Sequence, residues 1–484
     1  MSIKKGIDIK LNVKPVYLHL IHQEAYEGPC RTAYGEQLTK EFDIKIGEER
    51  FNNFKETLET TYSREINMLE PSYLTWTDEF IFHEKELNKL MKDVVETDIF
   101  LLDGVLLQFP VSKISTKIKK SVGIVGCCCA DTTAALKSKG LEAYGFIDHD
   151  DANRYLELLR SKKAINNTNV LVVLKDTMIS ALSTIANLED LKNDLGVHFT
   201  FINAEQVLDE VQNLNKEELN EAKKITNELV LNAEKNYMDS KYIFNSAKFY
   251  VTVKKMLEKY ECNAFTIPCF EICRTKRLDK EKYTFCLAHS LLKEEGIPSS
   301  CEGDINVLMA INVLINLTKK APHMGNTHPL AHEFKMDQST PSGLEIVKEI
   351  KGKKNIVSTW HAVPTRKMKG IDKEMMPYRI QSFTHSGWGA TLRYDFNRDK
   401  GETITLLRFH PTGKKMLAVK GEIVAGAGVD TIGCATGVYY QVNDVKDFFK
   451  KELEFGHHFA WVYGDYIEKI KDFGDILGIE VITA

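Results

Sequence analysis

The sequence predicts an α/β protein whose pattern changes after Lys320. Before that residue, apolar runs that suit buried strands alternate with helical patterns, an order typical of βαβ units and parallel sheets. After it, strand-like runs are joined by glycine-containing turns, which indicate antiparallel pairing. Because 484 residues are too many for one ordinary core, we expect roughly two to four domains.

The elements expected in the first 320 residues follow from hydrophobic periodicity. Short apolar runs predict strands, and longer stretches with apolar residues at helical spacing predict helices. The charged segment 117–120 marks the first expected boundary, and a new strand follows it. The predicted strands are 16–21, 99–103, 105–109, 121–126, 170–174, 197–202 and 264–270, and the predicted helices are 50–65, 84–95, 208–259 and 305–317.

The last part of the chain is expected to begin with antiparallel strands and to return to α/β alternation at its end. Turns at Gly401, Gly413 and Gly426 separate the strand-like runs. The predicted strands are 355–360, 403–409, 415–420, 438–442, 459–463 and 479–482, and the predicted helices are 445–453 and 467–476.

Composition and charge exclude several classes of protein. The net charge of -4 and the absence of a basic cluster with interleaved aromatic residues argue against a nucleic-acid partner. No apolar stretch reaches the roughly 18 residues that a membrane span requires, so we expect no membrane partner. The first residues contain no apolar segment typical of a secretory signal, and we therefore expect a cytoplasmic protein.

Ten cysteines are present, but their spacing matches no paired Cys-x-x-Cys zinc motif. Cys127, Cys128 and Cys129 are consecutive, which is poor geometry for ordinary disulfide pairing. They follow a buried-strand pattern, and free cysteine is among the most buried residue types. We expect reduced, structural thiols in a cytosolic protein rather than catalytic ones.

The segment Ser-Cys-Glu-Gly-Asp-Ile-Asn (residues 300–306) is the most informative part of the chain. Glu302 and Asp304 flank a glycine just ahead of a long apolar run that reads as a buried helix. Asp304 suits the first turn, where free N–H groups and the helix dipole favour an anion. Glu302 then lies on the preceding loop, a common place for a functional side chain. The alternative is that Asp304 is only a helix cap.

Four polar residues at predicted element ends form a candidate metal site: Glu302, Asn326, His361 and His458. Oxygen ligands combined with imidazoles suit a divalent ion such as Mn²⁺. A histidine at a strand end is, however, often purely structural. Neighbouring strand residues point to opposite faces, so we expect at most one of His457 and His458 to reach the site. Competing candidates are His323, His328, His332 and His385.

These segments resemble, in order and rough spacing, the L-fucose and L-arabinose isomerase superfamily. Cys-Glu-Gly-Asp-Ile-Asn (301–306) is similar to the family's Glu-Gly-Asp motif, in which the glutamate binds metal and moves protons. Pro-His-Met-Gly-Asn (322–326) resembles the segment that supplies the second acidic ligand. Thr-Trp-His (359–361) and Phe-Gly-His-His-Phe (455–459) resemble the segments with the two ligand histidines. The resemblance spans about residues 120–484.

One residue departs from the family pattern. Asn326 occupies the position of a carboxylate, and an amide can ligate through its oxygen but cannot act as a base. Glu271, Asp304 or Glu333 are the residues that could compensate, with Glu271 the preferred second acid–base group. Because of this departure, the alternative remains that the protein is a non-catalytic or divergent sugar-binding member of the same fold.

The resemblance implies two parallel-sheet α/β domains, 1–118 and 119–320, followed by a C-terminal domain, 321–484, with an antiparallel β-barrel-like part. It further implies a metal-dependent aldose–ketose isomerase that acts on a small sugar through an enediol, with Glu302 moving the proton. The family's enzymes are homotrimers or homohexamers with active sites between subunits, so we expect such an oligomer here.

Overall fold

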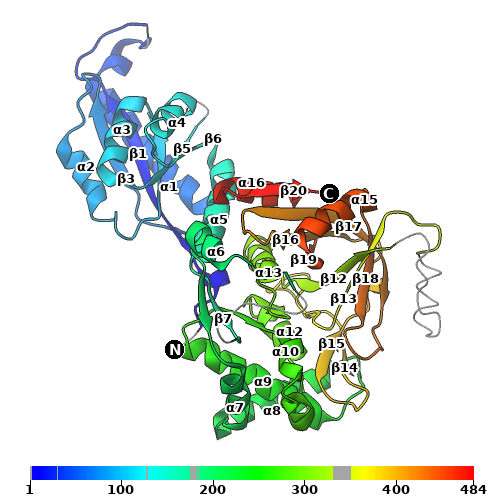
Figure 1. The fold of residues 1–484 in the computed structure, drawn as a ribbon. Coiled ribbons are helices and arrows are strands. Elements are labelled where there is room, and N and C mark those ends of the chain that lie inside the picture. Colours follow the sequence, from blue (N-terminus) through cyan, green and yellow to red (C-terminus); the bar gives the residue numbers. More distant parts are fainter. Residues whose placement is uncertain (1–2, 30, 127–128, 175–182, 185, 331–349) are drawn as a thin grey trace. The chain divides into compact units, whose positions relative to one another are not determined.

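The computed structural model describes residues 3–29, 31–126, 129–174, 183–184, 186–330 and 350–484. Two compact units emerge: Ile9–Arg160 forms one, which we call the first unit, and Met1–Asp8 with Ser161–Ala484 forms the second unit. Parallel sheets flanked by helices and a closed antiparallel β-barrel confirm the predicted fold class (Figure 1).

The first unit is built on a parallel sheet. Its described strands follow the order β2-β1-β4-β5-β6, and β3 pairs with the far end of β1. The strands are β1 (Leu11–Ile21), β2 (Ile66–Met68), β3 (Ser72–Thr77), β4 (Ile99–Gly104), β5 (Ser121–Val125) and β6 (Ala143–Phe146). The helices are α1 (Lys40–Thr61), α2 (Glu84–Met91), α3 (Gln108–Ile118) and α4 (Ala130–Lys137), and α5 (His149–Asn166) begins there.

Two sequence expectations for the first unit differ from the structure. The expected boundary at residue 118 is not where the compact units divide, because β5 pairs in parallel with β4 and extends the same sheet. Residues 105–109, predicted as a strand, instead lead into α3. Gly104 ends β4 with a φ of 102°, and a Cβ there would lie 2.1 Å from the carbonyl oxygen of Leu18. This close approach requires glycine, and the chain turns at that point.

The second unit begins with a parallel sheet in the order β11-β10-β7-β8. Its strands are β7 (Asn169–Val172), β8 (His198–Phe201), β10 (Ala264–Ile267) and β11 (Ser299–Cys301). The predicted helix 208–259 is wrong as a single element. Asn213 ends one helix and Asn215 caps the next through its side chain. The helices are α6 (Leu188–Leu195), α7 (Ala204–Gln212), α8 (Lys216–Asn232), α9 (Ser240–Lys259), α10 (Cys269–Cys273), α11 (Arg277–Glu281), α12 (Cys286–Glu294) and α13 (Ile305–Thr318).

Six antiparallel strands of the described chain then close a barrel in the order β16-β19-β12-β13-β18-β17, with β17 paired back to β16. The strands are β12 (His323–Pro329), β13 (Ile356–His361), β16 (Thr403–Phe409), β17 (Lys415–Ala427), β18 (Thr436–Gln441) and β19 (His458–Tyr463). Elements beside the barrel are α15 (Val445–Phe455), α16 (Ile467–Leu477) and β20 (Glu480–Thr483), and a small sheet joins β9 (Lys235–Asn236), β14 (Arg379–Ser382) and β15 (Ala390–Arg393).

Helix α13 connects the parallel sheet to the barrel and confirms the predicted buried helix. Every residue from 305 to 317 is buried, and the helix packs against β16 and β19 (Figure 1). An apolar helix of this kind is a core element because it has no face to offer to water. Both sides of the second expected boundary, at residue 320, therefore belong to one compact unit.

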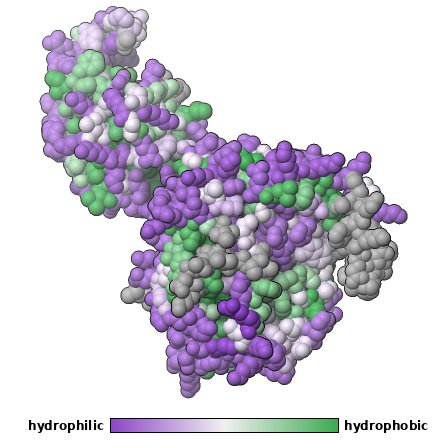
Figure 2. Space-filling model, in the orientation of Figure 1, coloured by the Kyte–Doolittle hydropathy of each residue, from purple (hydrophilic) through white to green (hydrophobic). Residues whose placement is uncertain are grey.

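The surface and the cysteines of the described residues have the properties expected of a globular protein. The visible face is mainly hydrophilic, with scattered apolar residues (Figure 2). None of the helices in the described ranges is both long and apolar enough to cross a bilayer. The seven cysteines whose positions are described are free thiols, whereas Cys30, Cys127 and Cys128 lie outside the described residues.

Candidate functional site

The structure brings the four predicted ligand residues together. Glu302 follows β11, whereas the other three lie on adjacent barrel strands, with Asn326 paired in register with His458. Oε2 of Glu302 lies 3.1 Å from Nε2 of His458, and its Oε1 lies 3.4 Å from Nε2 of His361. Oδ1 of Asn326 lies 2.6 Å from the same His458 nitrogen. Residues far apart in sequence thus share one small site.

A sharp turn in the backbone aims Glu302 into this site. Glu302 has a φ of 61° and Gly303 a φ of 66°, so two successive residues are left-handed between β11 and α13. For a residue with a Cβ this conformation costs roughly 1–2 kcal/mol. Such strain is typical of positions where the direction of a side chain serves a function.

Asp304 does two things at once. One carboxylate oxygen accepts a hydrogen bond from the backbone N–H of Val307, which confirms the predicted helix cap. The other lies 2.8 Å from Nδ1 of His458 and accepts a 3.0 Å bond from Arg408. With Nδ1 engaged, the His458 ring is held so that Nε2 faces Glu302 and Asn326. This orienting carboxylate behind a histidine is a common arrangement around metal ligands.

Arg408 was not identified as a site residue from the sequence alone. Its position as the one cation in the predicted strand 403–409 could have indicated a buried, functional charge. Its side chain is 1% exposed and hydrogen-bonds three groups besides Asp304. It donates to the carbonyls of Phe455 and His458 and to the hydroxyl of Thr184. Arg408 therefore fixes the loop that carries His458 relative to the start of α13.

The electrostatics favour ionised carboxylates. Burial opposes ionisation of Glu302, but hydrogen bonds from His361 and His458 outweigh it and lower the pKa of the carboxyl group. Burial likewise opposes ionisation of Asp304, yet Arg408 and His458 lower its pKa to about 2. Burial alone would lower the pKa of His458, but its bonds to Asp304 and Glu302 raise that pKa to about 9. Without a cation, His458 therefore carries the compensating positive charge.

The donor set fits a divalent cation. Glu302 and Asn326 both direct an oxygen at Nε2 of His458, and a single N–H can satisfy only one of them well. Nδ1 of His361 is buried without a hydrogen-bond partner in the described part of the chain. A cation in place of the His458 proton would satisfy both oxygens and leave imidazole nitrogens as ligands.

The competing histidines do not join this cluster. His323 is buried between the rings of Phe396 and Trp461. His328 is exposed and stacks on His457, so of the adjacent pair only His458 contacts Glu302. His385 is exposed on a turn, and His332 and Glu333 lie outside the described residues.

Glu271 lies on α10, the short helix that follows β10, and is half-buried. Two cysteines that the sequence predicted to be structural lie beside Glu302. The sulfur atoms of Cys269 and Cys301 and a carboxylate oxygen of Glu302 lie within 4.8 Å of one another. No spacing pattern revealed this group, because it depends on the pairing of β10 with β11.

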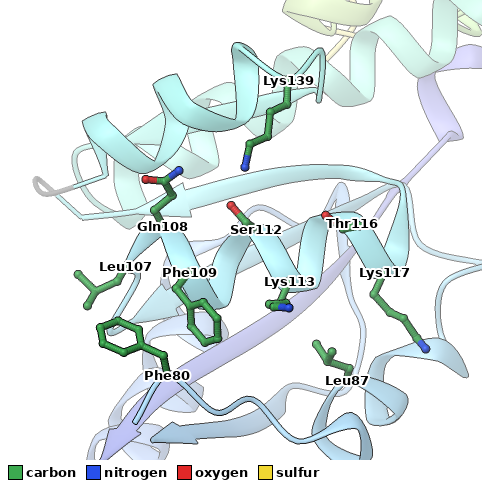
Figure 3. Close-up of a pocket in the computed structure, with 10 residues that line it drawn as sticks. All are labelled: Phe80, Leu87, Leu107, Gln108, Phe109, Ser112, Lys113, Thr116, Lys117 and Lys139. Carbon is green, nitrogen blue, oxygen red and sulfur yellow. The ribbon is translucent and has the colours of Figure 1, made fainter. Parts of the chain in front are cut away.

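A pocket in the first unit is chemically different from this site. It has a volume of about 810 Å³ and is lined by apolar side chains and lysines around α3. Phe80, Leu107 and Phe109 gather at one end of it (Figure 3). Its lining contains no carboxylate or imidazole, so it lacks the metal-ligand types of the Glu302 site.

Comparison with known proteins shows a distant relationship to sugar isomerases. The chain is 24% identical over 339 residues to proteins named sulfoquinovose isomerase from Priestia aryabhattai and Priestia megaterium. The matched region covers 68% of this chain and 67% of each relative. No protein-family model matches the sequence. The chain is thus distantly similar to sugar isomerases.

Proposed function

We propose that this protein is a metal-dependent aldose–ketose isomerase of the fucose/arabinose isomerase type. The observation that carries the proposal is the convergence of Glu302 on His361 and His458, with Asn326 completing the set. The distant similarity to proteins named sulfoquinovose isomerase supports the same reaction class. Glu302, Asn326, His361 and His458 would hold a divalent cation, Mn²⁺ by preference for oxygen and imidazole ligands.

The reaction assigns a role to each residue of the site. A bound divalent cation would polarise the sugar carbonyl and acidify the neighbouring hydroxyl. Glu302, kept ionised by its two histidines, takes the proton from C2 of the open-chain aldose and returns it to C1, so that the substrate passes through an enediol. Asp304 holds the His458 ring in place. Glu271 is the proposed second acid–base group for the sugar oxygens.

The substrate is proposed to be a small aldose, and the protein is proposed to work in the cytoplasm as a homotrimer or homohexamer. The test incubates Mn²⁺-loaded protein in D₂O with fucose, arabinose, sulfoquinovose and related aldoses, followed by NMR. We expect ketose to form and deuterium to appear at C2 of the recovered aldose. Absence of both turnover and exchange with every sugar would contradict the proposal.

Glu271→Gln separates the proton-transfer roles. This variant should bind Mn²⁺ like the wild type and should lose about 10²–10⁴-fold in kcat, the usual contribution of an acid–base group. An unchanged kcat would remove Glu271 from the mechanism without affecting the proposed metal ligands.

Asn326 favours a second candidate function, a sugar-binding protein of the same fold without catalysis. Its amide faces Nε2 of His458 where the resembled family has a carboxylate, and an amide cannot accept a proton. Asn326→Asp distinguishes the two functions. If isomerisation operates, the variant should keep or raise the activity. Sugar binding by calorimetry without turnover in either form would favour the second candidate.

A further inference from the structure

The carboxyl edge of the second unit's parallel sheet carries a pair of thiols. Cys301 is the last residue of β11, and Cys269 is the first residue of α10, two positions after β10. The parallel register pairs Ile267 with Cys301, so the two cysteines leave neighbouring strand ends together. Their sulfur atoms lie 3.7 Å apart.

This separation matches the spacing of two thiolates on one tetrahedral ion. With metal–sulfur bonds of about 2.3 Å, the tetrahedral edge is about 3.8 Å. The third potential ligand, a carboxylate oxygen of Glu302, lies within 4.8 Å of both sulfurs. Cys301 and Glu302 are buried, whereas Cys269 is partly exposed and provides the side from which an ion can enter.

We propose that Cys269, Cys301 and Glu302 form a second cation site, specific for a thiophilic ion such as Zn²⁺ or Cd²⁺. Two S–H bonds break as two metal–sulfur bonds form, both protons pass to solvent, and no oxidation or reduction occurs. Two thiolates and a carboxylate around a divalent ion leave one negative charge. Burial lowers the pKa of Lys293 on α12 to about 7, and negative charge at Cys301 acts in the opposite direction, so thiolate ligation would favour the charged form of Lys293.

The two sites share Glu302 and exclude each other. Its carboxylate turns toward His361 and His458 in the structure, and a thiolate-bound ion would draw one oxygen toward the sulfurs. A thiophilic ion would thereby remove one ligand from the proposed Mn²⁺ site. This competition rests on the proposed function, whereas the thiol site itself does not.

The first experiment uses metal-free protein, reduced with a phosphine, and titrates it with Cd²⁺ while thiolate-to-metal charge-transfer absorption is recorded. Wild type should saturate at one equivalent. Cys269→Ser should lose at least tenfold in affinity. Cys273→Ser, which removes an exposed thiol from the same short helix, should behave like the wild type. Absent absorption in the wild type, or equal absorption in Cys269→Ser, overturns the proposal.

The second experiment measures Mn²⁺ affinity with and without one equivalent of Cd²⁺. We expect Cd²⁺ to weaken Mn²⁺ binding at least tenfold in wild type and to have no effect in Cys269→Ser. Unchanged Mn²⁺ affinity alongside the thiolate absorption would overturn the sharing of Glu302. A chain that binds Cd²⁺ through its thiols but never binds Mn²⁺ would refute the proposed isomerase and leave the thiol site in place.

Discussion

Two histidine–carboxylate clusters in this protein use the same groups for different ends. In the first unit, the His149 ring lies between Tyr62, 2.6 Å from Nδ1, and Asp103, 3.0 Å from Nε2. In the second unit, Nε2 of His458 faces both Glu302 and Asn326, while Asp304 engages Nδ1. Both clusters lie near the carboxyl ends of parallel strands.

The two clusters differ in how the number of hydrogen-bond acceptors compares with the number of ring nitrogens. Each His149 nitrogen has one partner, so a single tautomer with Tyr62 donating satisfies the whole chain of groups. Around His458, the acceptor oxygens of Asp304, Glu302 and Asn326 converge on two ring nitrogens. The buried His361 ring adds a nitrogen near the other oxygen of Glu302. A balanced chain stabilises a fold, whereas an excess of convergent acceptors favours a cation.

The largest expected effect comes from Glu302→Gln. An amide is neutral, so the proposed ligand set loses the carboxylate charge that lies between His361 and His458. We therefore expect the variant to lose stoichiometric Mn²⁺. Isomerase activity should fall by at least about 10²-fold, the low end of acid–base contributions. Metal analysis of the purified variant and a ketose assay check both outcomes. Full metal content would refute the ligand role of Glu302.

Asp304→Asn should have the next largest effect. The amide can still cap α13 but no longer holds His458 through a charged bond, and loss of such an orienting partner weakens metal binding about 10–100-fold. Mn²⁺ titration measures the change. Asp444→Asn is the matched control, because Asp444 caps α15 by the same type of bond at the end of that helix opposite to His458. Equal affinities in the two variants would show that Asp304 is only a cap.

The sequence was sufficient for features that depend on local chemistry. The cap at Asp304, the buried helix after it and the strand ends with His361 and His458 follow from residue type and periodicity. Features that depend on strand order were not accessible. The membership of β5 in the first sheet and the contact of Cys269 with Cys301 require knowledge of which strands are neighbours. One-dimensional spacing contains no such information.

Glu452 on α15 provides a test of buried charge at a residue that contributes no atom to either cluster. This side chain of α15 is 5% exposed, and burial raises its pKa to about 8 despite the opposing effect of Arg408. In the unfolded chain the carboxyl group has its ordinary pKa of about 4.3, so it ionises there at a lower pH than in the folded protein. The free energy of unfolding therefore falls as pH rises from about 4.3 to 8.

Glu452→Gln should therefore stabilise the fold by several kcal/mol above pH 8 and should have little effect near pH 4.3. Denaturant unfolding at several pH values measures this dependence. Glu454→Gln, an exposed position of the same helix, is the control and should show no pH-dependent gain. A gain of equal size at pH 4.3 and pH 8.5 would contradict the assigned pKa.

The smallest expected effect separates the balanced cluster from the site. Tyr62→Phe removes the hydroxyl that lies 2.6 Å from Nδ1 of His149 and leaves that nitrogen without its partner. The free energy of unfolding should fall by about 1 kcal/mol, the usual net value of one hydrogen bond. Mn²⁺ content and isomerase activity should stay at wild-type levels, because the balanced chain binds no cation. Tyr34→Phe, at a position that is 89% exposed, controls for loss of a hydroxyl in general. Loss of metal in Tyr62→Phe, with the fold intact by circular dichroism, would show that the His149 cluster also serves the site and would break the distinction between the two.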